Sequence, residues 1–285
     1  MKINKKFKIT KIIIGLILFI AILPVNIYLS ENWIEINTYN LTPDKLPEEF
    51  RGFTILQLSD NHIIRKKDIK KNIDFFNATE KKLLKSNKRI DCVVITGDLL
   101  DDKSKMVPEA VAFVEAILTK YPVYFVEGNH DSDGDLTKGL LKIGVTVLQN
   151  KTEKLIRGTS TIYMTGVGDL STNRNDEDKA FNAVPINDFD ITLVHQPSNF
   201  KKLTNYGADL VLCGHTHGGQ IRIPFLPVLF APGQGFLPKY GYGFYEEKRP
   251  DLGQSVMYVN KGIGYSGLLN FRLFNRPEIS VFILE

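Results

Sequence analysis

The chain has 285 residues, of which 43% are hydrophobic and 24% charged, and its formal net charge is +4. This composition is that of a globular protein with enough chain for one sizeable core, and it excludes collagen-like and largely disordered chains. No internal repeat or low-complexity tract is present, and a single α/β domain of about 250 residues is within the usual range.

The N-terminus departs from this composition. Five lysines and no acid lie within residues 1–11, and an apolar run then begins at Ile12 and extends past Pro24 to Leu29. A membrane span needs roughly 17–25 residues, so the pattern predicts a basic cytoplasmic tail at 1–11 and a transmembrane signal anchor at 12–29. The alternatives are a buried core helix, which the lysine cluster disfavours, and a cleaved signal peptide, for which no small-x-small cleavage site is present before Asn32. We therefore expect a single-pass protein of the cell membrane, with the remaining chain outside the cytoplasm.

The basic charge of the chain comes from this tail. Without the five lysines the net charge is 4 − 5 = −1, so the charge indicates membrane topology and no nucleic-acid partner is expected. The two cysteines, Cys92 and Cys213, each lie in an apolar run typical of a buried strand. We expect inert core residues there, not a disulfide or a reactive thiolate.

Strands and helices alternate after a linker and first strand at 30–49. Strands are predicted at 53–59, 91–96, 121–127, 191–194 and 210–212, and helices at 68–86, 107–119, 135–143 and 198–206. Three short strand-like runs precede Gly166, and the last strands are predicted near 255–260 and 279–284. This alternation predicts a layered α/β domain over 50–285, with largely parallel pairing in the first half and a second sheet later.

Polar residues follow five of the predicted strands, at the point where each ends. The motifs are Asp60-Asn61-His62, Gly97-Asp98-Leu99-Leu100-Asp101, Gly128-Asn129-His130-Asp131, His195, and Gly214-His215-Thr216-His217. Ligands of open α/β sheets bind at the carboxyl ends of strands, so these side chains are expected at one edge. A lone histidine is usually structural, but all five histidines of the chain lie here, with Asp60 and Asp98 among them. Imidazole together with carboxylate suits Zn, Mn or Fe better than Ca or Mg.

The spacing within the motifs supports a shared site. In an extended chain, residues two apart point the same way, about 7 Å from each other, so Asp60 and His62 are expected to converge. By the same argument His215 and His217 reach one pocket. The glycines at 97, 128, 214, 218 and 219 are expected to form turns with positive φ and to let the backbone approach the site.

Taken in order, the five motifs resemble those of the calcineurin-like metallophosphoesterases, over roughly residues 50–285. The resemblance implies a four-layer αββα sandwich with two mixed β-sheets and two divalent metal ions at the sheet edge. The implied ligands are Asp60, His62, Asp98 and His217 for the first ion and Asp98, Asn129, His195 and His215 for the second, with Asp98 bridging. His130 is implied to face the substrate phosphate and to stabilise or protonate the leaving oxygen. Asp131 is grouped with His130 as catalytic, and Asp131 and Asp101 are implied to support the metal ligands from behind, although both also fit solvated loop carboxylates.

The implied reaction follows from the charges. Two divalent ions a few Å apart lower the pKa of a bridging water, hold the phosphate oxygens and stabilise in-line displacement, without a covalent enzyme intermediate. The segments 194–197 and 214–222 resemble the membrane-associated bacterial branch, some members of which cleave phosphodiesters or a lipid-linked pyrophosphate. A phosphodiester or lipid-linked pyrophosphate is thus the expected substrate. A phosphomonoesterase and, less favoured, a non-catalytic metal-bound scaffold protein remain as alternatives, and nothing indicates an oligomeric state.

A long apolar loop, residues 221–237, follows the last motif. Two interpretations are open: a surface for a lipid chain near the membrane, or side chains that pack beneath the sandwich, which we favour slightly because most apolar loop residues cover core. Arg174, Arg222 and Lys239 are candidate phosphate contacts, although each also fits an ordinary surface charge.

Overall fold

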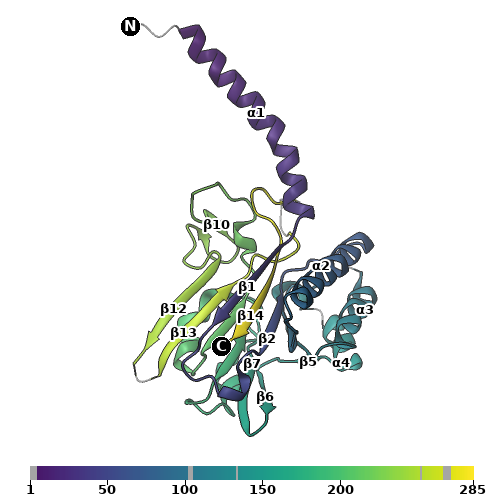
Figure 1. Ribbon diagram of the computed structural model, residues 1–285, viewed down its shortest axis with the longest axis vertical. Helices are drawn as coiled ribbons and strands as arrows, with labels where there is room; N and C mark the ends of the chain where they lie inside the picture. The colour runs from purple at the N-terminus through teal and green to yellow at the C-terminus, as the bar shows by residue number, and fades with distance from the viewer. Residues whose placement is uncertain (1–4, 102–104, 133, 251, 266–270) are drawn as a thin grey trace.

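The computed structural model describes residues 5–101, 105–132, 134–250, 252–265 and 271–285. Two six-stranded sheets lie face to face, and helices cover their outer faces (Figure 1). The predicted four-layer sandwich with two mixed sheets is therefore confirmed.

The first sheet has the order β1-β14-β2-β3-β4-β5. Its strands are β1 (Glu35–Leu41), β14 (Glu278–Leu284), β2 (Thr54–Leu58), β3 (Cys92–Thr96), β4 (Val123–Val126) and β5 (Thr146–Val147). Every neighbouring pair is parallel except β14 and β2. Helices α2 (Lys66–Lys85), α3 (Val107–Leu118) and α4 (Asp135–Ile143) are the crossover connections that such parallel pairing requires.

The second sheet has the order β12-β13-β9-β8-β7-β6. Its strands are β12 (Gly243–Arg249), β13 (Gly253–Val259), β9 (Leu210–Cys213), β8 (Asp190–Leu193), β7 (Ser160–Gly166) and β6 (Lys151–Arg157), accompanied by α5 (Glu177–Phe181) and α6 (Phe200–Asn205). The smaller elements are the hairpin β10 (Phe230–Ala231) and β11 (Gly235–Phe236) and the 3-10 turns η1 (Glu48–Phe50), η2 (Asn129–Asp131), η3 (Pro197–Asn199) and η4 (His217–Gly219). The two outer pairs of this sheet are antiparallel and the inner pairs are parallel.

Three buried apolar clusters join the four layers. The first packs α2, α3 and α4 against one sheet, the second fills the space between the sheets, and the third packs α5 and α6 against the other sheet. Representative side chains are Phe76 and Phe113 in the first cluster, Leu212, Tyr258 and Phe282 in the second, and Phe181 and Phe200 in the third. Cys92 and Cys213 are free and buried in β3 and β9, as predicted, and burial raises the pKa of both thiols.

Helix α1 (Lys5–Asn32) precedes the sandwich, continues through Pro24 and projects away from the domain (Figure 1). Its stretch Thr10–Asn32 is the one helix in the described parts of the chain that is long and apolar enough to cross a membrane. At ~1.5 Å per residue, these 23 residues extend about 35 Å, slightly more than the ~30 Å of a hydrocarbon core. The predicted span at 12–29 lies within this stretch.

Candidate metal centre and active site

The polar motifs gather at one edge of the sandwich, which we call the metal edge. Asp60 and His62 follow β2, Asp98 follows β3, η2 follows β4, His195 follows β8, and the last two histidines follow β9. Both sheets contribute, so the carboxyl ends of five strands meet where the sequence predicts.

The backbone of these motifs is not extended. Asp60, His62 and Asp98 have φ values of 48°, 43° and 52°, and His215 and His217 have values of 68° and 51°. The expectation that an extended chain brings residues two apart together is therefore wrong. Left-handed residues turn the chain sharply instead, and such conformations in non-glycine residues are typical of functional sites.

One cluster of candidate ligand atoms joins the end of β2 to the end of β9. Nε2 of His62 lies 3.2 Å from Nε2 of His217, which in turn lies 3.5 Å from Oδ1 of Asp60. Oδ2 of Asp98 lies 3.5 Å from Nε2 of His62. All four side chains are buried, and Asp60, His62 and His217 are close enough to hold one ion.

A second cluster lies on the other side of Asp98. Nε2 of His195 lies 3.1 Å from Nδ1 of His215 and 3.2 Å from Oδ2 of Asp98. These three residues form a further group of the size that one ion requires. Within the described chain, Oδ1 of Asn129 is buried without a hydrogen-bond partner, which is expected of an amide oxygen that serves as a metal ligand. The two clusters share one carboxylate oxygen, Asp98 Oδ2.

Neighbouring groups fix the orientation of the rings. Nδ1 of His195 lies 2.8 Å from the backbone oxygen of Thr96, so it carries the proton and leaves Nε2 facing Asp98. Asp101 lies on the far side of His62, with Oδ2 3.6 Å from Nδ1. The Ser59 hydroxyl donates to Oδ2 of Asp60 at 2.6 Å, and the backbone N–H of His215 donates to the same carboxylate.

Asp131 lies beneath the metal edge and is buried. Its carboxylate accepts hydrogen bonds from the backbone N–H groups of Leu99, Leu100 and Gly128, at 3.1–3.3 Å. Burial and the nearby charge of Asp98 raise the pKa of this carboxyl to about 7. Asp131 thus joins the turn after β3 to the turn after β4, and its contacts are those of a positioning residue.

His130 is partly exposed, as is His215, whereas His62, His195 and His217 are buried. Its ring centroid lies 5.0 Å from that of His62, and its Nε2 lies 4.0 Å from Oδ2 of Asp98. The backbone N–H of His130 donates to Oδ1 of Asp98 at 2.9 Å. The ring therefore borders the candidate ligands on their open side, where a substrate group would arrive.

The charges of the site are strongly coupled. Burial by itself lowers the pKa of His195, but the adjacent Asp98 outweighs burial and raises the pKa to about 10. Burial favours the neutral form of Asp98, yet His195 and His62 hold the pKa of that carboxyl well below its usual range. Burial and the charge of His195 lower the pKa of His215 to about 3, and burial and His62 lower that of His217 well below normal. His215 and His217 are therefore neutral and can bind a cation directly, whereas His195 must lose a proton before it can bind one.

Two glycines are required by space and not by a left-handed backbone. Gly97, Gly218 and Gly219 have positive φ as predicted, but Gly128 and Gly214 do not. A Cβ on Gly128 would lie 2.2 Å from Oδ1 of Asp98, and one on Gly214 would lie 2.1 Å from Oδ2 of Asp60. The expectation of positive φ is wrong at these two positions; here the missing side chain makes room for the carboxylates.

Some supporting residues lie outside the predicted set. Arg272 is fully buried, and its Nη2 lies 3.4 Å from Nδ1 of His217 and donates to the backbone oxygens of Lys261 and Gly264. It stands 55 residues beyond His217, so no local pattern marks it. Ser59 and Thr96 lie at the strand ends themselves, where the sequence pattern indicates only the neighbouring Asp and His ligands.

Each of the three candidate phosphate contacts has a neighbouring partner within the protein. Arg174 donates to Oε2 of Glu127 and to the backbone oxygen of Ser132. Arg222 and Lys239 lie over the rings of Tyr242 and Tyr240, respectively.

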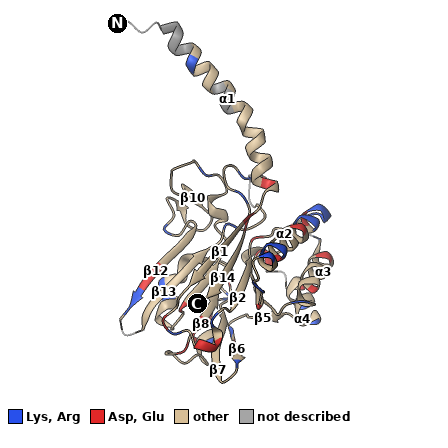
Figure 2. Ribbon diagram, in the orientation of Figure 1, with Lys and Arg blue, Asp and Glu red and all other residues tan. Residues whose placement is uncertain are grey.

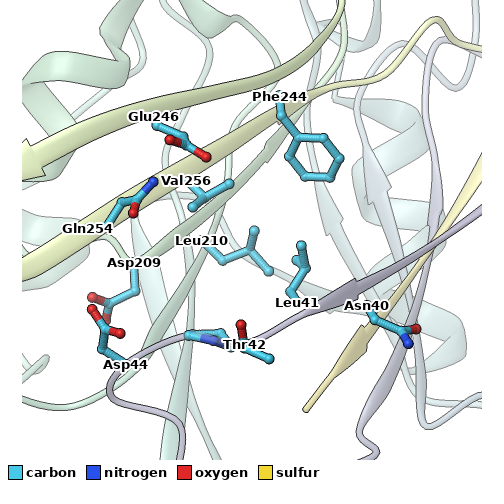
Figure 3. A pocket seen from close by; sticks show the side chains of 11 residues that line it. Asn40, Leu41, Thr42, Asp44, Asp209, Leu210, Phe244, Glu246, Gln254 and Val256 are labelled. Atoms are coloured by element: carbon cyan, nitrogen blue, oxygen red, sulfur yellow. The ribbon is translucent and has the colours of Figure 1, made fainter.

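A groove of about 400 Å³ lies at the other end of the sandwich, between β1 and β12 (Figure 3). It includes Leu210 at the start of β9, whereas the metal edge lies at the end of that strand. Its acidic residues include Asp209, which pairs with Arg249 and Lys45. This groove contains none of the motif residues.

The donor set fits divalent cations. Converging imidazole nitrogens and carboxylate oxygens are the ligands that Zn, Mn and Fe prefer. In each cluster two imidazole nitrogens lie 3.1–3.2 Å apart, close enough to share one cation or one proton. The coarse prediction of a His/Asp metal site is consistent with these groups, and the kind of metal is left open.

Comparison with known proteins gives the same class. The calcineurin-like phosphoesterase family profile matches residues 53–219. Metallophosphoesterase YkuE of Bacillus subtilis is 31% identical over 268 residues, covering 90% of this chain and 88% of that protein. Phosphodiesterase YaeI of Escherichia coli is 26% identical over 264 residues, covering 90% of each. A Danio rerio protein named transmembrane protein with metallophosphoesterase domain is 28% identical, covering 85% of this chain and 55% of that protein. This chain belongs to the calcineurin-like phosphoesterase family.

Proposed function

We propose that this protein is a membrane-anchored, binuclear metal-dependent phosphoesterase that hydrolyses a phosphodiester. The observation that carries the proposal is the position of Asp98 Oδ2, which lies 3.5 Å from Nε2 of His62 and 3.2 Å from Nε2 of His195. An oxygen shared by two imidazole-lined clusters has the position that a bridging ligand of a two-metal site needs.

The two cations would be held by the residues that the motifs predict. The first set is Asp60, His62, Asp98 and His217, and the second is Asp98, Asn129, His195 and His215. When bound, two such cations supply an activated water and offset the negative charge of an in-line displacement at phosphorus.

The protein's own side chains would orient and protonate the substrate. His130 is a partly exposed imidazole that belongs to neither proposed ligand set, and its backbone N–H donates to Asp98, so its ring is held where it can donate to a phosphate oxygen or to the leaving oxygen. Asp101 orients His62 from behind, and Asp131 holds the turns that carry Asp98 and His130.

The choice of a diester rests on the name of one relative. YaeI, which is 26% identical, is named a phosphodiesterase. A lipid-linked pyrophosphate is the other substrate class that we consider, because an apolar loop follows the last ligand motif. Turnover of a diester against a monoester separates diesterase from monoesterase.

The anchor and its direction are also part of the proposal. Helix α1 has the length of a span, and five lysines precede the apolar run, which supports an N-terminus in the cytoplasm and a catalytic domain outside it. Moving the lysines to follow Leu29 should reverse the accessibility of the domain to added protease. An unchanged accessibility would contradict the assignment of direction.

The first test uses the full-length protein in lipid nanodiscs. After metal stripping, Mn or Zn is added back, and metal content and hydrolysis of aryl phosphodiester and monoester substrates are measured. We expect two cations per chain, loss of metal and turnover in Asp98→Asn, and retained metal with about 10²- to 10⁴-fold slower turnover in His130→Ala. Asp135→Asn is the matched control, because this carboxylate is exposed at the start of α4. Tight metal binding without turnover of either ester or of a lipid pyrophosphate would favour the binding-protein alternative.

A further inference from the structure

Residues Ile223–Leu237, here called the apolar loop, expose large apolar side chains around the β10–β11 hairpin. The exposed residues are Ile223, Phe225, Leu226, Phe230, Phe236 and Leu237, whereas Ala231 is buried. The interpretation that this segment packs beneath the sandwich therefore fails for most of its large side chains. Clustered apolar exposure of this kind marks a surface that contacts another apolar phase or partner.

The apolar loop and the end of α1 line the same groove. A groove of about 450 Å³ is lined on one side by α1 residues and Trp33, and on the other by the loop residues Ile223, Pro224 and Phe225. Close by, the backbone N–H of Phe274 donates to Oδ1 of Asn26 at 2.6 Å. The loop and the base of α1 also lie at the same end of the molecule in Figure 1.

The sequence of α1 sets the depth of this groove relative to a membrane. No charged residue occurs from Ile12 to Ser30, between Lys11 and Glu31. These 19 residues correspond to about 28 Å of helix, close to the ~30 Å of a hydrocarbon core. Asn26 and Trp33 therefore lie near one boundary of a spanning α1, and a loop that shares a groove with this part of the helix lies at the level of the lipid headgroups.

The charge around the loop suits a lipid surface. Residues 220–245 include Arg222 and Lys239 but no acidic residue, and Figure 2 shows no red along the chain around β10. Trp33, which is exposed, lies under the guanidinium of Arg276. Exposed aromatic side chains beside cations are typical of segments that lie in the membrane interface.

We propose that the apolar loop and Trp33 form a second contact with the bilayer, inserting into the headgroup region of the leaflet where α1 ends. The proposal rests on the membrane span proposed for α1. A Cβ on Gly233 would lie 2.9 Å from Nε2 of His215, so the loop borders the metal edge. Docking of the loop would thus hold the metal edge against the membrane surface.

The test uses the single tryptophan of the chain. In a Trp33→Phe background, Phe225→Trp places a probe on a fully exposed side chain of the loop, and Ile156→Trp places a matched probe on an exposed side chain of β6, far from α1 in Figure 1. The full-length proteins are reconstituted at less than one chain per vesicle, with lipids brominated at shallow acyl positions. We expect a blue shift and quenching for Phe225→Trp and neither for Ile156→Trp.

A second comparison separates docking from simple tethering. With the probe moved to Phe236→Trp, adding Phe225→Glu and Leu226→Glu should weaken the quenching, whereas adding Ile156→Glu should not. Quenching that is unaffected by Phe225→Glu and Leu226→Glu would overturn the proposal, because the α1 tether alone would then set the position of the loop. A blue shift without bromine quenching would also overturn it and indicate a protein surface over the loop. Vesicle flotation reports the anchor separately: a chain that floats with an unquenched probe refutes the docking alone, and a chain that does not float refutes the anchor.

Discussion

Gly214 allows a quantitative test of the metal edge. Its φ is not positive, so an alanine fits the backbone, but a Cβ there would lie 2.0 Å from Oγ of Ser59 and 2.1 Å from Oδ2 of Asp60. Since Cβ contacts below 3.0 Å essentially do not occur, the two distances must grow by at least 3.0 − 2.0 = 1.0 Å and 3.0 − 2.1 = 0.9 Å, through movement of these oxygens or of the backbone that carries His215. Metal–ligand distances tolerate only about 0.2 Å.

Gly214→Ala should therefore lose the cation that Asp60 helps to hold. A displacement of this size costs turnover about 10²-fold, and the crowding destabilises the fold by about 1–3 kcal/mol. Metal content per chain, aryl phosphodiester hydrolysis and thermal unfolding measure the three effects. Adding Ser59→Ala to Gly214→Ala should not restore metal binding, because the contact between the new Cβ and Asp60 remains.

Gly52→Ala is the control for a general effect of alanine. Gly52 has a φ of +82° with open space around it, so the substitution strains the backbone by about 1–2 kcal/mol without touching the metal edge. We expect a lower unfolding temperature with full metal content and turnover. A folded Gly214→Ala protein that binds two cations and turns over like the wild type would refute the placement of Asp60.

Three further predictions follow from charges. Asp101→Asn, which removes the carboxylate 3.6 Å from Nδ1 of His62, should weaken metal affinity about 10- to 100-fold in a metal titration; an unchanged affinity would show that Asp101 is only a loop carboxylate. Metal loading at pH 7 should release at least the proton of His195, since Asp98 raises the pKa of this ring to about 10 against the effect of burial, and nearby carboxylates raise the pKa of His62 as well. Calorimetry in buffers of different ionisation enthalpy measures the released protons, and a count of zero would contradict the prediction. Burial raises the pKa of Asp190 from 3.8 to about 7, so the folded state favours the protonated form and stability falls as the pH rises from about 4 to 7, by about 4 kcal/mol in all (7 − 3.8 = 3.2, at ~1.4 kcal/mol per pH unit). Asp190→Asn should remove the part of the fall that comes from Asp190, while buried Asp131, whose pKa is also raised to about 7, contributes its own part. Equal unfolding free energies of the wild type at pH 5 and pH 8 would contradict the prediction.

Local patterns predicted the elements that lie around the metal edge. Helix α4 begins and ends where the sequence predicts, because its acidic start and Gly144 mark the two ends. The motif positions were predictable for a similar reason: a buried apolar strand followed at once by Asp, Asn or His leaves the polar group at the strand end. These signals need only a few neighbouring residues.

Features that depend on distant partners were not predicted. Strand β12 and helix α5 have no separate prediction, and β14 pairs between β1 and β2, more than 200 residues earlier in the chain. Arg272 reaches His217 only after the chain has returned to the metal edge. The left-handed φ of the ligands is also invisible to composition, since it is imposed by hydrogen bonds between neighbouring turns, such as that from the backbone N–H of His62 to the oxygen of Asp98.

Strand direction connects the site to the anchor. Strand β1 starts next to α1, pairs parallel with β14, and β14 is antiparallel to β2. Hence β1 starts at the edge where β2 and β3 end, and the chain enters the sandwich at the metal edge. Glu35 at the start of β1 pairs with Lys261, whose backbone oxygen accepts from Arg272 beside His217. Had β1 been parallel to β2, the same candidate ligands would lie at the far end from α1, so the orientation of one edge strand puts the metal edge on the side of the domain where α1 joins it.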